Sequence, residues 1–267
     1  MIAKLKDILN LLERIAPSGW AEPWDNTGLQ VGSCSQEIKK VSFALDPTLR
    51  ALRSASEKNA QLLFTHHPLI FKPLSELNID TYPGNVISES LINGISIIAA
   101  HTNLDAAKGG INDILSELLD LQHVQVLHKT ENTEGIGLGR VGDLPEPCSF
   151  MDLIKKVKTI FGVDNLRVSG REKSRIARIA ILGGSGGNMA LHAFKKGADI
   201  LLTGDVGHHH ALEAMALGIT LIDAGHFNTE KKAFSIFADR FMEMSRDEGW
   251  DLTVEIDNEE EDPLHDV

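Results

Sequence analysis

The sequence predicts a layered α/β protein, and three observations support this fold class. Short apolar runs typical of buried strands alternate along the chain with segments of helical periodicity. The length of 267 residues fits one large domain or two modest ones, and 42% hydrophobic residues supply ample material for a core. Two pairs of strand-bearing segments also resemble each other, which indicates an internal duplication.

The first half begins with a predicted amphipathic helix. Its apolar positions recur at three- and four-residue spacing from Ile2 to Ile15, and Pro17 marks its end. An ordered loop is expected at 21–31. The other elements expected in this half are strands at 41–45, 61–65 and 95–100 and helices at 47–57 and 111–121.

The second half has weaker signals at its start, because residues 128–147 are rich in glycine and lack long periodic runs. Ser149 is expected to cap a helix that ends near Phe161, with Asp152 three residues on as in a capping box. Further strands are expected at 176–182, 200–203 and 219–222, with helices between and after them.

The duplication joins segments from the two halves. Residues 58–65 (KNAQLLFT) resemble 196–203 (KGADILLT), and 93–101 (NGISIIAAH) resemble 217–226 (LGITLIDAGH) with one residue inserted. General likeness among α/β units is the alternative, since every matching segment is a strand with its following loop. A real duplication predicts two similar halves that face each other across a shared site.

Charge and cysteine content exclude several classes of protein. The net charge of −12 disfavours general binding to nucleic acid or anionic membranes, although a locally basic groove would still permit it. Residues 258–267 hold five carboxylates and are expected to form a solvated acidic tail. Cys34 and Cys148 form neither a disulfide framework nor a CxxC motif, so a reducing cytoplasm is expected. No signal peptide or membrane span is predicted.

Histidines and acids follow three apolar strands directly. The three segments are 62–68 (LLFTHHP), 97–105 (IIAAHTNLD) and 221–230 (LIDAGHFNTE). Ligands of open α/β sheets bind beyond the carboxyl ends of strands, so three such ends can bring their side chains together. His101 and Asp105 are four residues apart, as are His226 and Glu230, which places each pair on one side of a helical turn.

A metal centre is the chemical reason to gather such groups. Imidazole and carboxylate suit Zn, Fe, Mn or Co, and the lack of cysteine disfavours a thiolate site. Five or six ligands exceed the four of a closed tetrahedral site, which favours two bridged ions about 3.5–4 Å apart. The alternative is that these histidines only form hydrogen bonds at strand ends.

Two further motifs leave their roles open. Gly183–Gly187 (GGSGG) lies between a strand and a helix, where it could bind an anion or form a tight turn. It matches neither GxGxxG nor a Walker loop. His208–His210 could edge the site or begin a solvated helix. The sequence holds no GxSxG elbow, and neither cysteine has a nucleophile context.

Four motifs in order are similar to those of the Nif-three-like family, many of whose members are named GTP cyclohydrolase I type 2 homologs. They are 65–68 (THHP), 101–106 (HTNLDA), 224–230 (AGHFNTE) and 21–29 (AEPWDNTGL), which resembles the family's Trp–Asp–Asn–x–Gly loop. The resemblance implies two similar, intertwined α/β subdomains with mixed sheets. The first would comprise 1–127 with about 223–267 and the second about 128–222, while the acidic tail lies outside the resemblance.

The same resemblance implies a site and an assembly. The ligands of a dinuclear centre would be His66, His67, Asp105, His226 and Glu230. Glu230 would bridge two divalent ions per chain, and His101 would be a close neighbour. The family also implies a toroidal homohexamer with its metal sites facing an internal cavity.

The function expected from these features is metal-dependent hydrolysis of a small molecule, a nucleotide or related purine. For GTP, water would attack C8 and formate would be lost, with His101 as the catalytic proton carrier because imidazole titrates near physiological pH. His101 as a further metal ligand is the alternative for that residue. The competing functions are a phosphoesterase using the same metals and a metal-binding adaptor or metallochaperone without turnover.

Overall fold

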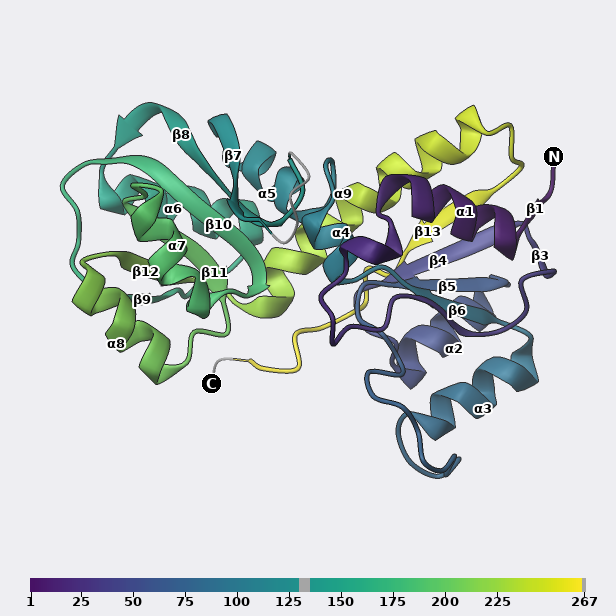
Figure 1. Ribbon diagram of the computed structural model, residues 1–267. Helices are drawn as coiled ribbons and strands as arrows, with labels where there is room; N and C mark the ends of the chain where they lie inside the picture. Colours follow the sequence, from purple (N-terminus) through teal and green to yellow (C-terminus); the bar gives the residue numbers. More distant parts are fainter. Residues whose placement is uncertain (130–134, 266–267) are drawn as a thin grey trace. The chain divides into compact units, whose positions relative to one another are not determined.

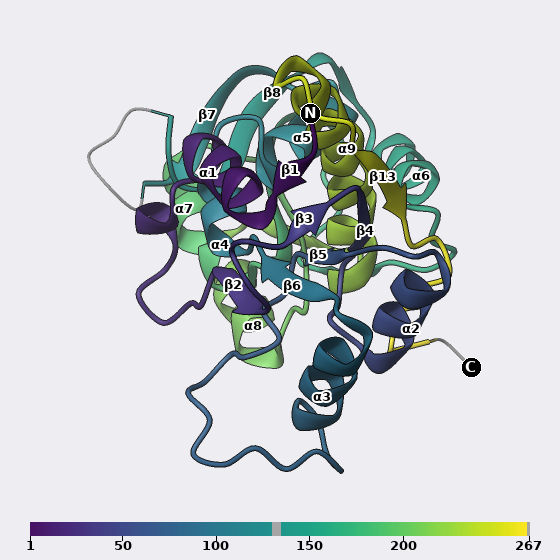
Figure 2. The same ribbon diagram turned by 90° about the vertical axis from the view of Figure 1, so that its right-hand side faces the viewer.

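The computed structural model describes residues 1–129 and 135–265, and the chain forms two compact units. The first unit comprises Met1–Leu104 with Phe234–Val267, and the second comprises Asp105–Ala233. Each unit has a mixed sheet flanked by helices (Figures 1 and 2). The predicted layered α/β class with mixed sheets is therefore confirmed.

The first unit is built on a five-stranded sheet. Its order is β13 (Thr253–Ile256), β4 (Lys40–Ala44), β5 (Leu62–Thr65), β6 (Ser96–Ala99) and β2 (Gly28–Val31). The first four strands are parallel and β2 is antiparallel to β6. A small separate sheet pairs β1 (Ala3–Lys4) with β3 (Glu37–Ile38), so the predicted first helix, α1 (Leu5–Ile15), begins only after β1.

Helices cover both faces of this sheet (Figure 1). One face packs Ala44, Leu63 and Ile97 against α2 (Leu49–Glu57) and α3 (Gly84–Asn93). The other face presents Phe43 and Phe64 to the part of α9 (His226–Asp247) that belongs to this unit. Neighbouring residues of a strand point to opposite faces, which is why consecutive apolar residues are buried on both sides here.

The second unit is built on a six-stranded sheet. Its order is β7 (Gln122–His128), β8 (Leu138–Cys148), β10 (Ile176–Ser185), β11 (Ile200–Gly204), β12 (Thr220–Asp223) and β9 (Arg167–Ser169). The strands β10, β11 and β12 are parallel, and the remaining pairs are antiparallel.

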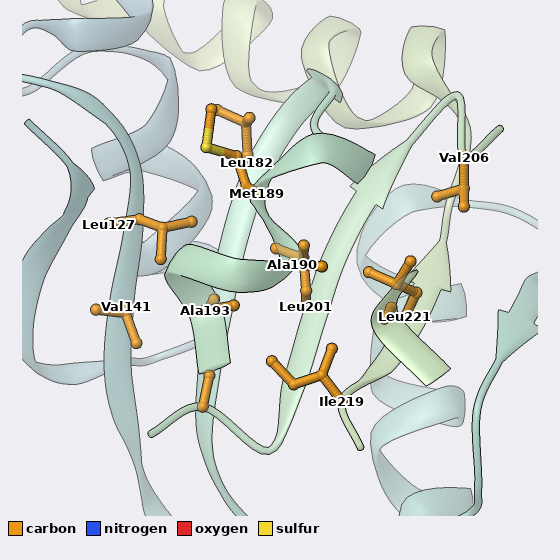
Figure 3. Packing of buried hydrophobic residues seen from close by; sticks show 13 residues of the cluster. Leu127, Val141, Leu182, Met189, Ala190, Ala193, Leu201, Val206, Ile219 and Leu221 are labelled. Atoms are coloured by element: carbon orange, nitrogen blue, oxygen red, sulfur yellow. The ribbon is translucent and has the colours of Figure 1, made fainter. Parts of the chain in front are cut away.

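The core of the second unit joins this sheet to short helices. Leu182, Leu201 and Leu221 come from the three parallel strands and pack with Met189 and Ala193 (Figure 3). The covering elements are η2 (Gly187–Met189), α7 (Ala190–Lys195) and α8 (His208–Leu217). The other helices of the unit are α5 (Ile111–Leu118), which contacts β8 and β10, and α6 (Phe150–Phe161), while α4 (Thr102–Ala106) crosses the unit boundary.

The two units share one strand and helix order. The first contains β4-α2-β5-α3-β6 and the second β10-α7-β11-α8-β12, each with its three strands parallel. An antiparallel edge strand, β2 or β9, lies beside the last strand of each series. The segments that resemble each other in sequence thus form equivalent strands, which supports duplication over general likeness.

Glycine and proline account for the elements that the sequence pattern missed. The region expected to lack long periodic runs, 128–147, contains most of the long strand β8, and its residues 130–134 lie outside the described part. Gly139, Gly142 and two prolines interrupt the apolar alternation that would mark this strand. The loop expected at 21–31 likewise ends in β2. The helix capped by Ser149 is confirmed, since its side chain accepts a hydrogen bond from the Asp152 N–H.

Most described residues of the acidic tail are exposed, as expected, but Glu260 is held against the first unit. The Glu260 carboxylate accepts hydrogen bonds from the backbone N–H groups of Leu45 (2.8 Å) and Asp46 (3.0 Å). Just before it, the Asp257 side chain is fully buried and pairs with Arg50 at 3.0 Å. Glu260 in the tail and Asp257 just before it therefore serve the first unit as hydrogen-bond acceptors. Among the described residues, no helix combines the length and apolarity needed to cross a membrane.

Candidate metal centre

Three histidines gather at one edge of the sheet in the first unit. His66 and His67 follow β5 directly, and His101 follows β6 by one intervening residue. These strands are parallel neighbours with Thr65 opposite Ala99, so their carboxyl ends meet. One ring nitrogen from each histidine lies within 4.8 Å of the others, a spacing that could hold a metal ion.

The Nδ1 atom of each of these rings faces an oxygen. His66 Nδ1 lies 2.8 Å from the carbonyl oxygen of Ala100, and His67 Nδ1 lies 2.7 Å from Asp46 Oδ1. His101 Nδ1 lies 2.8 Å from Asp25 Oδ1. An oxygen acceptor places the ring proton on Nδ1, which leaves Nε2 in the deprotonated form that binds metals. Metal-binding histidines are held in this way, so the three side chains fit a metal centre.

The pKa of the Asp25 carboxyl group is shifted by its surroundings. Its side chain is fully buried, which by itself would raise the pKa. Hydrogen bonds and charge from His101, with hydrogen bonds from the N–H and hydroxyl of Thr102, outweigh burial and lower the pKa to about 2. Asp25 is therefore a carboxylate at neutral pH and accepts the hydrogen bond from His101 Nδ1.

A second set of candidate ligands lies in the second unit. His226 is the first residue of α9 and Glu230 lies one turn later, with 2.9 Å between His226 Nε2 and Glu230 Oε2. His226 Nδ1 lies 2.7 Å from Asp205 Oδ2, which repeats the pattern of the other three histidines. The Glu230 side chain is only 4% exposed, so its carboxylate is held against the protein rather than in solvent.

Gly184 makes room for this pair. A Cβ at this position would lie 2.0 Å from Glu230 Oε1 and 3.2 Å from His226 Nε2. The backbone there has φ of +64°, a conformation that favours glycine. The Gly183–Gly187 segment thus acts as a closely packed strand end and turn. The backbone N–H groups of Gly183 and Gly184 already donate to Asn112 Oδ1 (3.0 Å) and Thr229 Oγ1 (3.1 Å).

Asp105 lies in α4 and is tied to the same neighbourhood. The buried Asn112 accepts from the Gly183 N–H, while its Nδ2 donates to the Asp105 carbonyl oxygen at 3.0 Å. The chain after Asp105 is held by the buried Arg140, whose guanidinium donates to the carbonyl of Ala106 at 3.4 Å. Both contacts fix the backbone that carries the Asp105 carboxylate.

The structure therefore places the predicted site residues in two sets. His66, His67 and His101 lie together in the first unit, and His226 and Glu230 form a pair in the second, with Asp105 in the same unit. The first set makes His101 a candidate ligand as well as a candidate proton carrier. His208 and His209 are exposed at the start of α8, as in a solvated helix start.

Sequence reasoning missed the acceptors that orient the histidines. Asp46 follows β4 and Asp205 follows β11, so both stand at carboxyl ends of strands, the signal that identified the histidines. Asp25 lies within the Trp–Asp–Asn–x–Gly motif, but no local pattern pairs it with His101. Asn112 carries no signal beyond being a polar residue within an apolar helix.

Histidines and carboxylates at the strand ends of two similar mixed α/β units define the class of this protein: an α/β protein with a candidate metal centre. The Duf34/NIF3 (NGG1p interacting factor 3) family model matches residues 3–263, and the chain belongs to this family. The family suggested by the four sequence motifs is thereby confirmed.

Relatives and solved structures agree with this assignment. A protein of Clostridium perfringens named GTP cyclohydrolase 1 type 2 homolog is 39% identical, with 85% of this chain and 87% of that protein covered. A Bacillus cereus protein related to NIF3 superposes with a TM-score of 0.93 at 26% identity, with both chains fully covered. A Staphylococcus aureus protein superposes with a TM-score of 0.94 at 29% identity, also over both full chains.

Proposed function

We propose that this protein is a dinuclear metal-dependent hydrolase that acts on a nucleotide. The observation that carries the proposal is the orientation of four histidines, each with Nδ1 on an oxygen: His66, His67, His101 and His226. Such orientation prepares Nε2 for a metal and is the arrangement found around metal-bound histidines. The names of the curated relatives supply the reaction class.

The proposed ligands of two divalent ions are His66, His67, Asp105, His226 and Glu230. Zn, Fe, Mn and Co share this ligand preference, and Glu230 is the proposed bridge. Bound divalent ions supply Lewis acidity and allow water to act as a nucleophile near neutral pH. The chain's own contribution is to hold these side chains in fixed orientations and, at Gly184, to leave space for the Glu230 carboxylate.

His101 is the proposed proton carrier. Its Nε2 would accept a proton from the attacking water, and Asp25 at Nδ1 would stabilise the imidazolium that results. With GTP, two water molecules would be consumed as two C–N bonds of the imidazole ring break and C8 leaves as formate. His101 would return its proton to the departing ring nitrogen, so that the residue ends the cycle neutral.

A turnover screen tests this proposal. Metal-reconstituted protein would be incubated with a panel of nucleotides, with formate and inorganic phosphate measured separately and Glu230→Ala as the metal-depleted control. Formate release supports ring opening, while phosphate release would show phosphoester cleavage. Neither product from a protein with full metal content would contradict catalysis and favour the adaptor or metallochaperone function.

A further inference from the structure

An exposed aromatic pair lies beside the three histidines of the first unit. Trp24 is 54% exposed and Phe71 is 47% exposed, and their ring centroids are 5.6 Å apart. The Trp24 indole also lies edge-on to His101, with ring centroids 5.9 Å apart. An aromatic surface therefore begins at the candidate proton carrier and continues over two accessible rings.

The loops that carry these rings are tied down on both sides. Asp25, next to the indole, pairs with His101 Nδ1 at 2.8 Å. Asn26 Nδ2 donates to the carbonyl oxygen of Ile70 at 2.6 Å, and the Ile70 N–H donates to Gln30 Oε1 at 3.1 Å. Ile70 directly precedes the exposed phenylalanine, so these bonds connect the two loops. The aromatic pair is thus held in place without being buried.

Exposed aromatic rings held in fixed positions beside a polar site are typical of a ligand-binding surface. The free energy falls when a large apolar side chain is removed from water. Contiguous exposed apolar surface therefore commonly marks a binding site. Aromatic rings bind other planar rings by offset or edge-to-face stacking. Removal of one stacking side chain typically weakens binding of a nucleobase by roughly ten- to a hundredfold.

We infer that Trp24 and Phe71 form a binding platform for the planar heterocycle of the substrate. The ring system stacks on the Trp24 indole, and the carbon to be attacked lies toward His101. This inference rests on the proposed function, which gives His101 its role, and it specifies the substrate class. Purine nucleotides bind through the base, whereas sugar phosphates and other compounds without a planar ring lack the main contact.

Equilibrium binding of two probes tests the platform. Guanosine carries the base without phosphate, and inorganic triphosphate carries the charge without a base. Trp24→Leu in the full-length, metal-loaded protein should weaken guanosine binding by roughly ten- to a hundredfold and leave triphosphate binding within about twofold. Trp24→Phe retains an aromatic ring and should keep most of the guanosine affinity, which a purely structural role would not predict.

Trp250→Leu is the matched control. Trp250 precedes β13, whose Thr253 pairs with Lys40 at the amino end of β4. This is the edge of the parallel sheet opposite the histidines, so the substitution should leave guanosine affinity unchanged. Circular dichroism and light scattering would verify that all variants keep the fold and the molecular mass of the wild type.

Three results would overturn the platform. The first is wild-type protein that does not bind guanosine, and the second is a folded Trp24→Leu variant that keeps the wild-type guanosine affinity. The third is a Trp24→Leu variant whose molecular mass changes while its guanosine affinity does not. Failure of the hydrolase proposal is distinguishable, because binding is measured without turnover. Base binding that depends on Trp24, with no formate or phosphate released, would reject only the hydrolase. Turnover that persists unaltered in Trp24→Leu would reject only the platform.

Discussion

Substitution of Gly184 by alanine tests whether the second unit is shaped to hold the Glu230 carboxylate. The new Cβ would lie 2.0 Å from Glu230 Oε1, and ordinary contacts begin near 3.4 Å. The carboxylate would therefore have to move by about 1.4 Å, whereas metal–ligand distances tolerate changes of about 0.2 Å. The φ of +64° adds strain of roughly 1 kcal/mol for any residue other than glycine.

Gly197→Ala separates the strain from the displacement. Gly197 has φ of +70°, and a Cβ added there would meet no heavy atom within 4 Å. Gly197→Ala therefore introduces the backbone strain without any steric clash. As metal-free protein, Gly197→Ala should lose roughly 1 kcal/mol of unfolding free energy in urea, and Gly184→Ala should lose at least as much because the buried Glu230 carboxylate must also move. Only Gly184→Ala should weaken Zn²⁺ binding, by at least about 10- to 100-fold in competition with a chelator. Equal Zn²⁺ affinity in the two variants would refute the reasoning.

Four further predictions concern the metals, the proton carrier, its carboxylate and the assembly. Protein purified without chelator should contain about two metal ions per chain, and Glu230→Ala should lose most of both; full occupancy in that variant by metal analysis would rule out a bridge. His101→Ala should keep most of its metal while its turnover falls about 10²- to 10⁴-fold, whereas Asp105→Ala should lose both; equal metal loss would identify His101 as a ligand. In metal-free protein, Asp25→Asn should cost about 2 kcal/mol of unfolding free energy at pH 7, because the folded pKa of Asp25 is about 2 against 3.8. That contribution is complete above about pH 4 and is lost as the pH falls toward 2. The unfolding free energies of the wild type and Asp25→Asn, measured in urea, should therefore become equal near pH 2; a difference that stays constant with pH would contradict this prediction. Light scattering at micromolar concentration should report a homohexamer, and a monomer mass of 29.2 kDa would exclude it.

Local sequence patterns were sufficient for the parts of the fold and site that depend on neighbouring residues. The strands that precede His66, His101 and His226 are short and mostly apolar, and their carboxyl ends mark the histidines without any knowledge of the fold. The strand β8 was not predicted, because its glycines and prolines interrupt the alternation of apolar and polar residues. A strand of this kind is stabilised by its partners, β7 and β10, rather than by its own residues.

The acceptors that orient the histidines could not be predicted, because they come from distant parts of the chain. Asp25 reaches His101 across 76 positions, and Asp46 reaches His67 across 21. Only the pairing of β4, β5 and β6 brings these residues to the same edge. The packing role of Gly184 likewise depends on α9, which lies far along the chain from β10.

The discontinuity of the first unit has a consequence for synthesis on the ribosome. The second unit is one continuous stretch, whereas the first needs Phe234–Val267 for β13 and for the aromatic side chains that cover Phe43 and Phe64. Domains fold as units once their residues have emerged, so the second unit can fold while the first still lacks a sheet edge and a helix. Phe43 and Phe64 stay accessible to chaperones during that interval. The half of the protein that is made first is therefore completed last.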